Sequence, residues 1–267
     1  MAERATDPVQ LARRWVVDYF NRQDAAAARA FITPDYALEI GDVVFAGRDT
    51  AWLPAVAKQM ETFPGMGMTV HQVLAGTDRV AVCFTEHGAS GGPGGRVAVW
   101  SGVAIYRSNG TQLTGCVAQE DYLTRLRQLK SGQADPVDPP AAAPWDTLAL
   151  PPDPAAEAAV RRWLMGSWPH PEAAVRCDDE HLTGVPLQFE VTSGKVTELF
   201  SSGPEVAFHV VQTGLYRGGM TGVAASTQPM TLHVNGLVRV QDGQVVSGRV
   251  IRDRIGLRGA LLKGIKP

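Results

Sequence analysis

The chain lacks several features on which whole classes of function depend. Its formal net charge is only -2, from 25 basic and 27 acidic residues in 267. Such a balance provides no broad positive field for the phosphates of nucleic acid or for an anionic lipid surface. No apolar run approaches the length needed to cross a bilayer, and the first residues, "MAERATDPVQLARR", are polar and charged. We therefore expect a soluble, cytoplasmic protein with neither a nucleic-acid nor a membrane partner.

Cysteine and the common cofactor motifs are also scarce. Cys83, Cys116 and Cys177 are scattered and not spaced as metal pairs, so we expect reduced core thiols and no disulfide framework or zinc site. The glycine-rich stretch "GASGGPGG", residues 88–95, falls between two expected strands and does not open a helix, so it is not a phosphate cradle. No serine or cysteine nucleophile motif is present. The pattern favours chemistry on a neutral organic molecule without a cofactor or a metal.

What the sequence does contain is an internal repeat. "ARRWVV" at residues 12–17 is echoed by "VRRWLM" at 160–165, and "VHQVLAGTDRVAVCFTEHG" at 70–88 by "VTELFSSGPEVAFHVVQTG" at 196–214, without a gap. Agreement at matching places indicates two copies of one domain. A stretch rich in Pro, Ala and Asp separates them, which predicts a domain at 1–130, a linker at 131–154 and a second domain at 155–267.

Each copy has an α+β pattern of helices followed by antiparallel strands. In the first copy, apolar periodicity predicts helices at 9–20, 25–32 and 47–63. Alternation predicts strands at 36–45, 68–74, 79–86, 96–107 and 112–123. The second copy offers only "LQFEVTSGK" where the first has its long third helix. It is therefore expected to be a shortened copy that lacks one wall of the fold.

The helices-then-sheet order, with "FPGMGMTVHQVLAGTDRVAVCFTEHG" and the close "QEDYLTRLRQL", resembles the nuclear transport factor two-like superfamily. Within it, the SnoaL-like polyketide cyclases are the most similar, over nearly all of residues 10–130 and more faintly over 155–262. The resemblance implies two tandem cone-shaped α+β barrels, each with N-terminal helices packed on a curved antiparallel sheet. Such a cone houses isomerases, cyclases, epoxide hydrolases, dehydratases and non-catalytic binders, so the fold alone does not settle the function.

The same resemblance points to one catalytic candidate. In these cyclases a carboxylate on the last strand acts as acid and base, and the matching position is Asp121. The ketosteroid isomerase branch fits less well, because its second Asp falls on Gly102. The alternative for Asp121 is structural, as a helix cap or as a partner of Arg125 four residues on. The second copy has Arg254 at the matching position, which predicts that the second domain has lost the function.

Two further carboxylates are catalytic candidates from the residues themselves. Glu86 follows Val80, Val82 and Phe84 on one strand face, whereas His87 belongs to the other face. Asp42 falls on the same strand face as neighbouring apolar residues, because side chains at every second position point the same way, and it is expected to project into the same cavity. Glu86 has a plainer interpretation as a solvated group at a strand end. Tyr19 and the three tryptophans among the residues expected to bind substrate have core packing as the alternative, and the histidine has a satisfied place in the sheet as its alternative. The residues expected to bind substrate are Tyr19, Trp15, Trp52, Met60, Phe84, Trp100 and His71.

These observations predict a cofactor-independent cyclase or isomerase acting by proton transfer on a hydrophobic, polyketide-like or aromatic small molecule held in the N-terminal pocket. An epoxide hydrolase on the same fold is the nearest enzymatic alternative. A non-catalytic small-molecule binding or scaffold protein is the alternative from a different class. We expect the two domains to pair within the chain, sheet on sheet. The sequence does not decide between a monomer and a homodimer.

Overall fold

The computed structural model describes residues 7–91, 94–166 and 174–264. The first six residues of the polar start and residues 92–93 of the glycine-rich stretch thus lie outside the described residues. The chain divides into two units: the first comprises residues 1–118 and 124–150, and the second comprises residues 119–123 and 151–267. Most of the predicted linker thus belongs to the first unit, and the five residues around Asp121 belong to the second.

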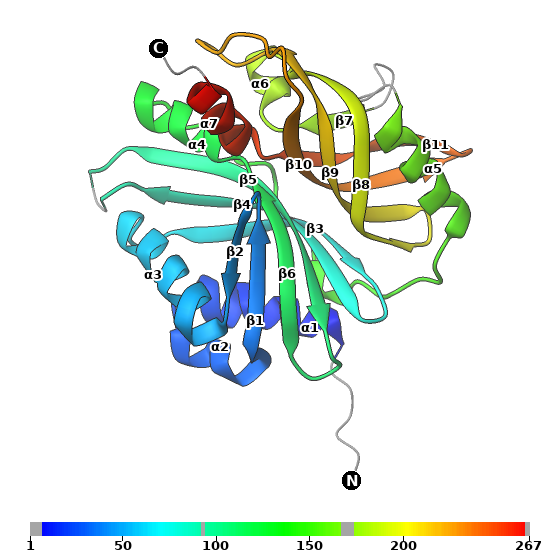
Figure 1. Cartoon of the computed structure of the whole chain (residues 1–267). Coiled ribbons are helices and arrows are strands. Elements are labelled where there is room, and N and C mark those ends of the chain that lie inside the picture. Colours follow the sequence, from blue (N-terminus) through cyan, green and yellow to red (C-terminus); the bar gives the residue numbers. More distant parts are fainter. Residues whose placement is uncertain (1–6, 92–93, 167–173, 265–267) are drawn as a thin grey trace. The chain divides into compact units, whose positions relative to one another are not determined.

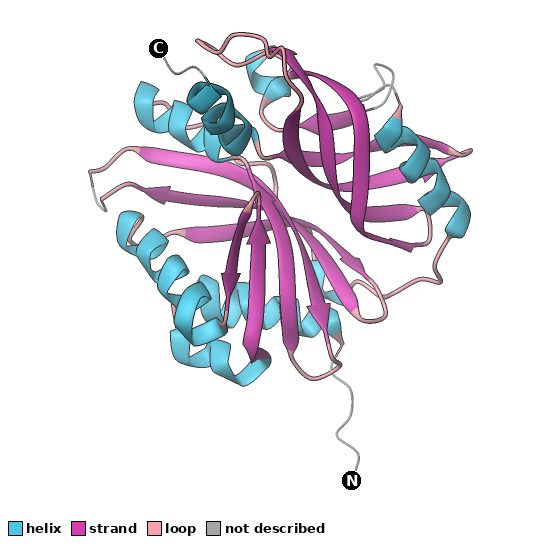
Figure 2. Cartoon of the chain, viewed as in Figure 1, coloured by secondary structure: helices cyan, strands magenta, loops and turns pink. Residues whose placement is uncertain are grey.

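Helices open the first unit and are placed where the apolar periodicity predicted them (Figures 1 and 2). Asp7 and Asp24 cap the start of two of them: the Asp7 carboxylate accepts from one free N–H group of the first turn, and the Asp24 carboxylate accepts from two. The predicted helix at 9–20 changes at Arg14 into a π-helix, a rare form that often marks functional sites. The elements are α1 (Pro8–Arg13), η1 (Arg14–Phe20), α2 (Ala25–Phe31), η2 (Arg48–Trp52) and α3 (Leu53–Thr62).

A six-stranded sheet follows, in the order β2-β1-β6-β5-β4-β3. Its strands are β1 (Ile32–Ile40), β2 (Val43–Ala46), β3 (Gly67–Ala75), β4 (Arg79–Ala89), β5 (Val97–Ser108) and β6 (Leu113–Glu120). The sheet is mixed and not wholly antiparallel as predicted, because β1 and β6 pair in parallel. Such pairing needs a long connection, which the intervening helices and strands provide. The unit continues into α4 (Tyr122–Ser131) and the short η3 (Pro144–Asp146).

The second unit repeats this plan in shorter form. Its elements are α5 (Pro154–Met165), β7 (Ala174–Cys177), α6 (Glu180–Thr183), β8 (Gln188–Ser202), β9 (Glu205–Gly218), β10 (Met230–Gln241), β11 (Gln244–Arg252) and α7 (Arg254–Gly264). The sheet order is β7-β11-β10-β9-β8, with β7 parallel to β11. Between α5 and β8, the described residues hold a helix of only four residues. Nothing among them corresponds to α3, in agreement with the shortened sequence.

One packing device recurs in both units. The Phe84 ring on β4 lies over Gly102 on β5, where an added Cβ atom would come within 2.3 Å of the ring. In the second unit the Phe208 ring lies in the same way over Gly236. Glycine is required at these two strand positions because the ring occupies the space of a side chain. The two sheet faces are therefore filled by the same means.

Candidate functional site

The helices of the first unit cover the sheet face that carries Glu86. In the strand register Glu86 lies opposite Trp100 of β5 and Met68 of β3, and directly opposed residues share a face. The rings of Trp15 on η1 and Tyr106 on β5 are 5.5 Å apart, which places η1 over this same face. The alternation of β4 thus predicted the orientation of Glu86 correctly.

Glu86 is a buried carboxylate, with 2% of its surface exposed. The side-chain amide of Gln59, on α3, donates a hydrogen bond of 2.7 Å to its Oε2 atom. Burial removes hydration from a carboxylate, and the amide replaces one of the hydrogen bonds that water would have made. The strand supplies the acid and α3 supplies its donor, so the site depends on the helix that the second copy lacks.

Aromatic side chains form the wall beside this carboxylate. Trp52 is fully buried, with its ring centroid 5.1 Å from Tyr19, 5.1 Å from Tyr36 and 6.5 Å from Trp15. Trp100 packs on Phe63, and the Arg125 guanidinium lies over its ring. The predicted aromatic residues therefore surround one apolar interior. This packing satisfies both interpretations of them, as core and as the walls of a site.

A hollow of about 350 Å³ opens beside Tyr19, between α3 and the end of the first helices. Its volume lies at the lower end of the range for small-molecule sites, roughly 300–1,000 Å³. Met60, one of the residues expected to bind substrate, is in its lining. The described residues around it are Tyr19, Gln23, Ala25, Leu53, Ala57, Met60, Glu61 and Pro64.

Tyr19 connects this hollow to the buried carboxylate. Burial raises the pKa of Tyr19 well above its ordinary value, and the charge of Glu86 raises it further. The phenol therefore keeps its proton at neutral pH and remains a hydrogen-bond donor. A donor of this kind can polarise a carbonyl group or hold a developing enolate.

His71 does not belong to this site. Its Nε2 atom is 2.7 Å from the hydroxyl of Thr85, and its Nδ1 atom is 2.9 Å from the carbonyl oxygen of Pro139. Thr85 and His87 alternate with Glu86 and so belong to the opposite sheet face. Both ring nitrogens of His71 have partners, which is the structural alternative considered for it. The predicted substrate contact is therefore replaced by a fixed sheet histidine.

Asp42 is not brought to the interior either. The strand predicted at 36–45 is interrupted by a turn at Gly41 and Asp42, after which β2 pairs back on β1. Gly41 has a φ of +55°, which glycine adopts without strain. Asp42 therefore lies exposed in a hairpin turn. The parity argument failed because it assumed one continuous strand.

Asp121 lies after β6 ends, within a buried ionic cluster of the second unit. Both of its carboxylate oxygens accept from Nη2 of Arg254, at 2.6 and 2.7 Å. Arg254 also lies 2.8 Å from a carboxylate oxygen of Asp179 and 3.2 Å from one of Asp178. Asp178 in turn accepts from Arg252, which also pairs with Glu180. Burial raises the pKa of Asp121, Arg254 lowers it, and the charges of Asp178 and Asp179 raise it, so that the net direction is upward.

The partner of Asp121 is thus the residue at the matching position of the other copy. Local reasoning weighed only Arg125, four residues on, whereas the cation comes from 133 positions further along the chain. Asp121 is a buried carboxylate, but both of its oxygens are hydrogen bonded to a guanidinium that also pairs with other carboxylates. This arrangement favours the structural interpretation of Asp121 over proton transfer.

The second unit has a different group where Glu86 stands in the first. Gln212 is buried, and its amide donates a 3.2 Å hydrogen bond to the backbone carbonyl of Leu164 on α5. An amide cannot accept or release a proton at neutral pH. The repeat therefore keeps the position polar but removes the acid–base group.

Gln59 is the functional candidate that sequence reasoning missed. It lies seven residues after Trp52 and three after Val56, so in a helix it shares a face with these two apolar residues. A polar residue on such a stripe is a signal, because burying it requires a partner. That signal pointed to an interior hydrogen bond, although not to Glu86 as its acceptor.

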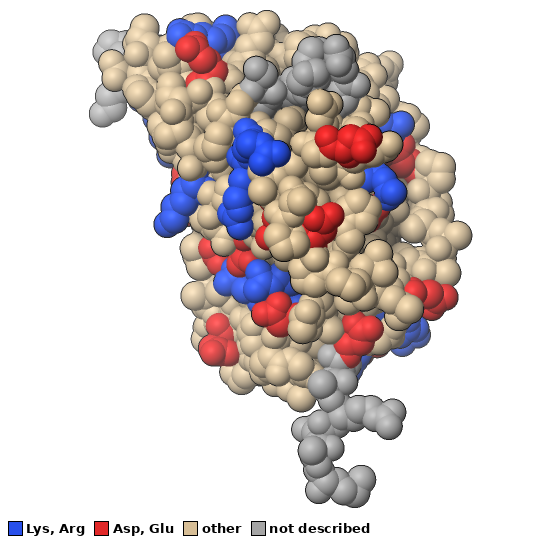
Figure 3. All heavy atoms as spheres, turned by 90° about the vertical axis from the view of Figure 1, so that its right-hand side faces the viewer, with Lys and Arg blue, Asp and Glu red and all other residues tan. Residues whose placement is uncertain are grey.

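Two features are absent from the residues that the structure describes. No group of three or more His, Cys, Asp or Glu side chains among them is arranged to hold a metal ion, and no helix in that part of the chain is long and apolar enough to span a membrane. On the face drawn in Figure 3, Lys and Arg side chains are interspersed with Asp and Glu.

Comparison with known families matches both halves of the chain. A model described as a SnoaL-like domain matches residues 12–115, and one described as a SnoaL-like polyketide cyclase matches residues 186–261. No curated protein matches the sequence.

Solved structures resemble a single copy. IdmH, a candidate polyketide cyclase from Streptomyces antibioticus, is 23% identical over 47% of this chain and 99% of its own, with a TM-score of 0.42. A candidate SnoaL-like polyketide cyclase from Jannaschia sp. CCS1 is 20% identical over 49% of this chain and 96% of its own, with a TM-score of 0.42. TsrD from Streptomyces laurentii is 19% identical over 45% of this chain and 92% of its own, with a TM-score of 0.40.

Proposed function

Because the chain consists of two SnoaL-like domains in tandem, we propose that the first is a cyclase or isomerase that needs no cofactor and acts on a hydrophobic small molecule. The observation that carries the proposal is the buried Glu86 carboxylate, hydrogen bonded by Gln59 and lying close enough to Tyr19 to raise its pKa. The substrate class is a flat, polyketide-like or aromatic molecule, since aromatic side chains dominate this interior.

The chemistry begins at an acidic C–H bond next to a carbonyl group. A carboxylate oxygen of Glu86 takes the proton, and the electron pair of the C–H bond moves into an enolate. The Tyr19 hydroxyl donates a hydrogen bond to the enolate oxygen, and its raised pKa keeps the proton on the phenol. Return of the proton to another carbon completes an isomerisation, whereas attack of the enolate carbon on a second carbonyl group within the substrate closes a ring.

The test is a deuterium-exchange screen in D2O with apolar 1,3-dicarbonyl compounds, followed by mass spectrometry. The parent protein should catalyse exchange at the carbon between the carbonyl groups, and Glu86→Gln should lower the rate by about 100-fold or more. Tyr19→Phe should lower it as well, because it removes the donor and keeps the ring. Binding of the same compound, measured by calorimetry, should persist in both variants.

Two alternatives are distinguished by the same preparation. Binding without exchange in the parent protein would indicate a binding module and refute the proton-transfer proposal. Incorporation of oxygen from labelled water into a diol, with an epoxide as substrate, would indicate an epoxide hydrolase. In that case the same carboxylate would activate water instead of a C–H bond.

A further inference from the structure

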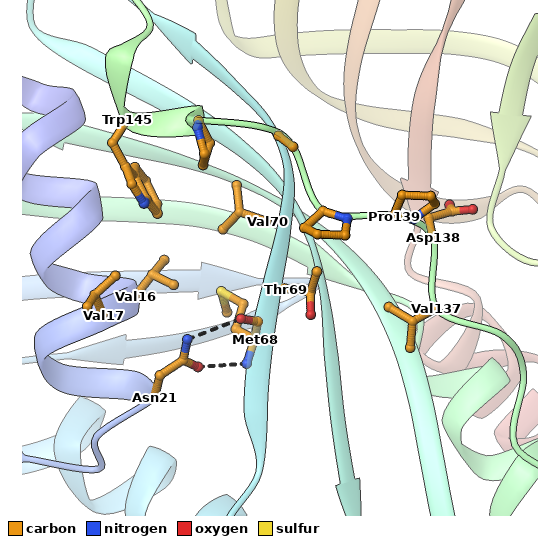
Figure 4. Close-up of a pocket in the computed structure, with 13 residues that line it drawn as sticks. Val16, Val17, Asn21, Met68, Thr69, Val70, Val137, Asp138, Pro139 and Trp145 are labelled. Carbon is orange, nitrogen blue, oxygen red and sulfur yellow. Dashed lines mark hydrogen bonds between the residues drawn. The ribbon is translucent and has the colours of Figure 1, made fainter.

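A second, larger hollow of about 520 Å³ lies on the first unit, away from the residues assigned to proton transfer. Three segments enclose it: η1, the edge strand β3 and the proline-rich segment 137–145, which we call the strap. Figure 4 shows Val16, Val17 and Trp145 on one side, Val137 on the other, and residues 68–70 of β3 between them. The volume falls within the range of small-molecule sites, roughly 300–1,000 Å³.

Three hydrogen bonds hold the strap, two from the edge strand β3 and one from α1. The backbone N–H of Ala141 donates to the carbonyl of Val70, at 2.9 Å. The side-chain amide of Gln10 donates to the carbonyl of Trp145, at 3.2 Å. The Nδ1 atom of His71 contacts the carbonyl oxygen of Pro139. Because a carbonyl oxygen can only accept, the Nδ1 atom of His71 carries the proton. The wall of the hollow is therefore held in place before any ligand binds, which lowers the cost of binding.

The lining is apolar, with few polar groups left for a ligand. The side-chain amide of Asn21 is already bonded to the backbone of Met68: it donates to the carbonyl oxygen at 3.1 Å and accepts from the N–H group at 2.7 Å (Figure 4). The indole N–H of Trp145 has no hydrogen-bond partner in the described part of the chain. Asp138 is the one charged side chain among the described lining residues, which include no Lys or Arg. An anionic ligand would find no counter-ion here.

We propose that this hollow is a second ligand site, which takes a neutral, flat aromatic molecule carrying a hydrogen-bond acceptor. The ring packs on the indole of Trp145 and against the valines of η1, and the acceptor takes the indole N–H. The site is separate from Glu86 and the hollow beside Tyr19, and it belongs to the strap that the sequence presents as a linker.

Fluorescence titration with a matched pair of dyes tests the proposal. The neutral probe is 7-diethylamino-4-methylcoumarin, and the anionic probe is 7-diethylaminocoumarin-3-carboxylate. The neutral dye should bind one saturable site, and Trp145→Ala should weaken its binding by about tenfold, since stacking and apolar contact at one ring are together worth roughly 1.4 kcal/mol. Trp145→Phe should weaken it less, because a ring remains. The anionic dye should bind more weakly than the neutral one.

Leu148→Ala is the matched control, because Leu148 is on the same stretch of chain, is 76% exposed and does not line the hollow. It should leave dye binding unchanged. Met60→Ala reports on the other hollow. If Trp145→Ala binds the neutral dye as well as the parent, or if Met60→Ala alone weakens binding, the dye occupies the hollow beside Tyr19 and the proposal is overturned. Absence of saturable binding would also overturn it.

Discussion

Replacing Arg254 should destabilise the second unit far more than replacing Asp121. Arg254 contacts the carboxylates of Asp121, Asp178 and Asp179 while only 5% exposed. In Arg254→Met the stem is kept and the cation is lost, so three buried carboxylates face one another. Removing one partner of a buried pair costs about 3–5 kcal/mol because the remaining charge is uncompensated. We expect a loss in that range.

Asp121→Asn should cost only about 1 kcal/mol, because the asparagine oxygen still accepts from Arg254 and the cation keeps two carboxylates. The two substitutions should also be non-additive. In the double variant one of the facing carboxylates is already neutral, so the loss should be smaller than the sum of the single losses. The free energies follow from urea denaturation at pH 7, with hydrogen exchange of β11 as a readout local to this unit.

The pH dependence gives an independent check. The pKa of Asp121 is already raised by burial and lowered in part by Arg254, so loss of Arg254 raises it further above the unfolded value. A raised pKa means that the folded state binds the proton more tightly than the unfolded state, so stability falls as pH rises. Arg254→Met should therefore regain stability between pH 7 and pH 5. A loss below about 1 kcal/mol, or a variant that is no more stable at pH 5, would refute the ionic account of this cluster.

Three further outcomes follow from buried groups. Gln212→Glu sets a carboxylate against the carbonyl group of Leu164, so it should lower the free energy of unfolding by about 1–3 kcal/mol at pH 7, measured by urea denaturation. The lost stability should return at acid pH, where the carboxylate is protonated. Equal stability at neutral and at acid pH would contradict this. Gly102→Ala places a Cβ atom 2.3 Å from the Phe84 ring and should cost about 1–3 kcal/mol; an unchanged urea midpoint would count against that packing. Burial raises the pKa of Cys177 to about 12, so iodoacetamide at pH 8 should alkylate it only after unfolding; rapid labelling of the native protein would show the thiol to be accessible.

Local patterns were sufficient to predict much of the first unit. Alternation of apolar residues placed β3, β4 and β5 and put Glu86 on the face of the large apolar side chains, because the side-chain period of a strand is fixed. The ungapped match of two segments indicated the duplication, and the missing stretch indicated the missing helix. Each of these inferences needs only the sequence pattern and no knowledge of a contact between distant residues.

Contacts between distant residues were not predictable in this way. Nothing local to Asp121 indicates Arg254, and the pairing of β1 with β6 joins strands about 80 residues apart. The turn at Asp42 was missed because "YALEIGDVVF" reads as one apolar run, although its Gly-Asp pair is a hairpin signal. The sequence left His71 open between a substrate contact and a sheet histidine, because the carbonyl group of Pro139 that accepts its proton is 68 residues away.

The most direct test of the central claim compares two carboxylates in one assay. Proton transfer to carbon is measured by deuterium exchange on a single 1,3-dicarbonyl substrate, for the parent protein, Glu86→Gln and Asp121→Asn. We predict that Glu86→Gln loses exchange by about 100-fold or more, while Asp121→Asn retains a rate close to that of the parent. Loss of exchange in Asp121→Asn, with exchange intact in Glu86→Gln, would contradict the account and return the chemistry to the last strand.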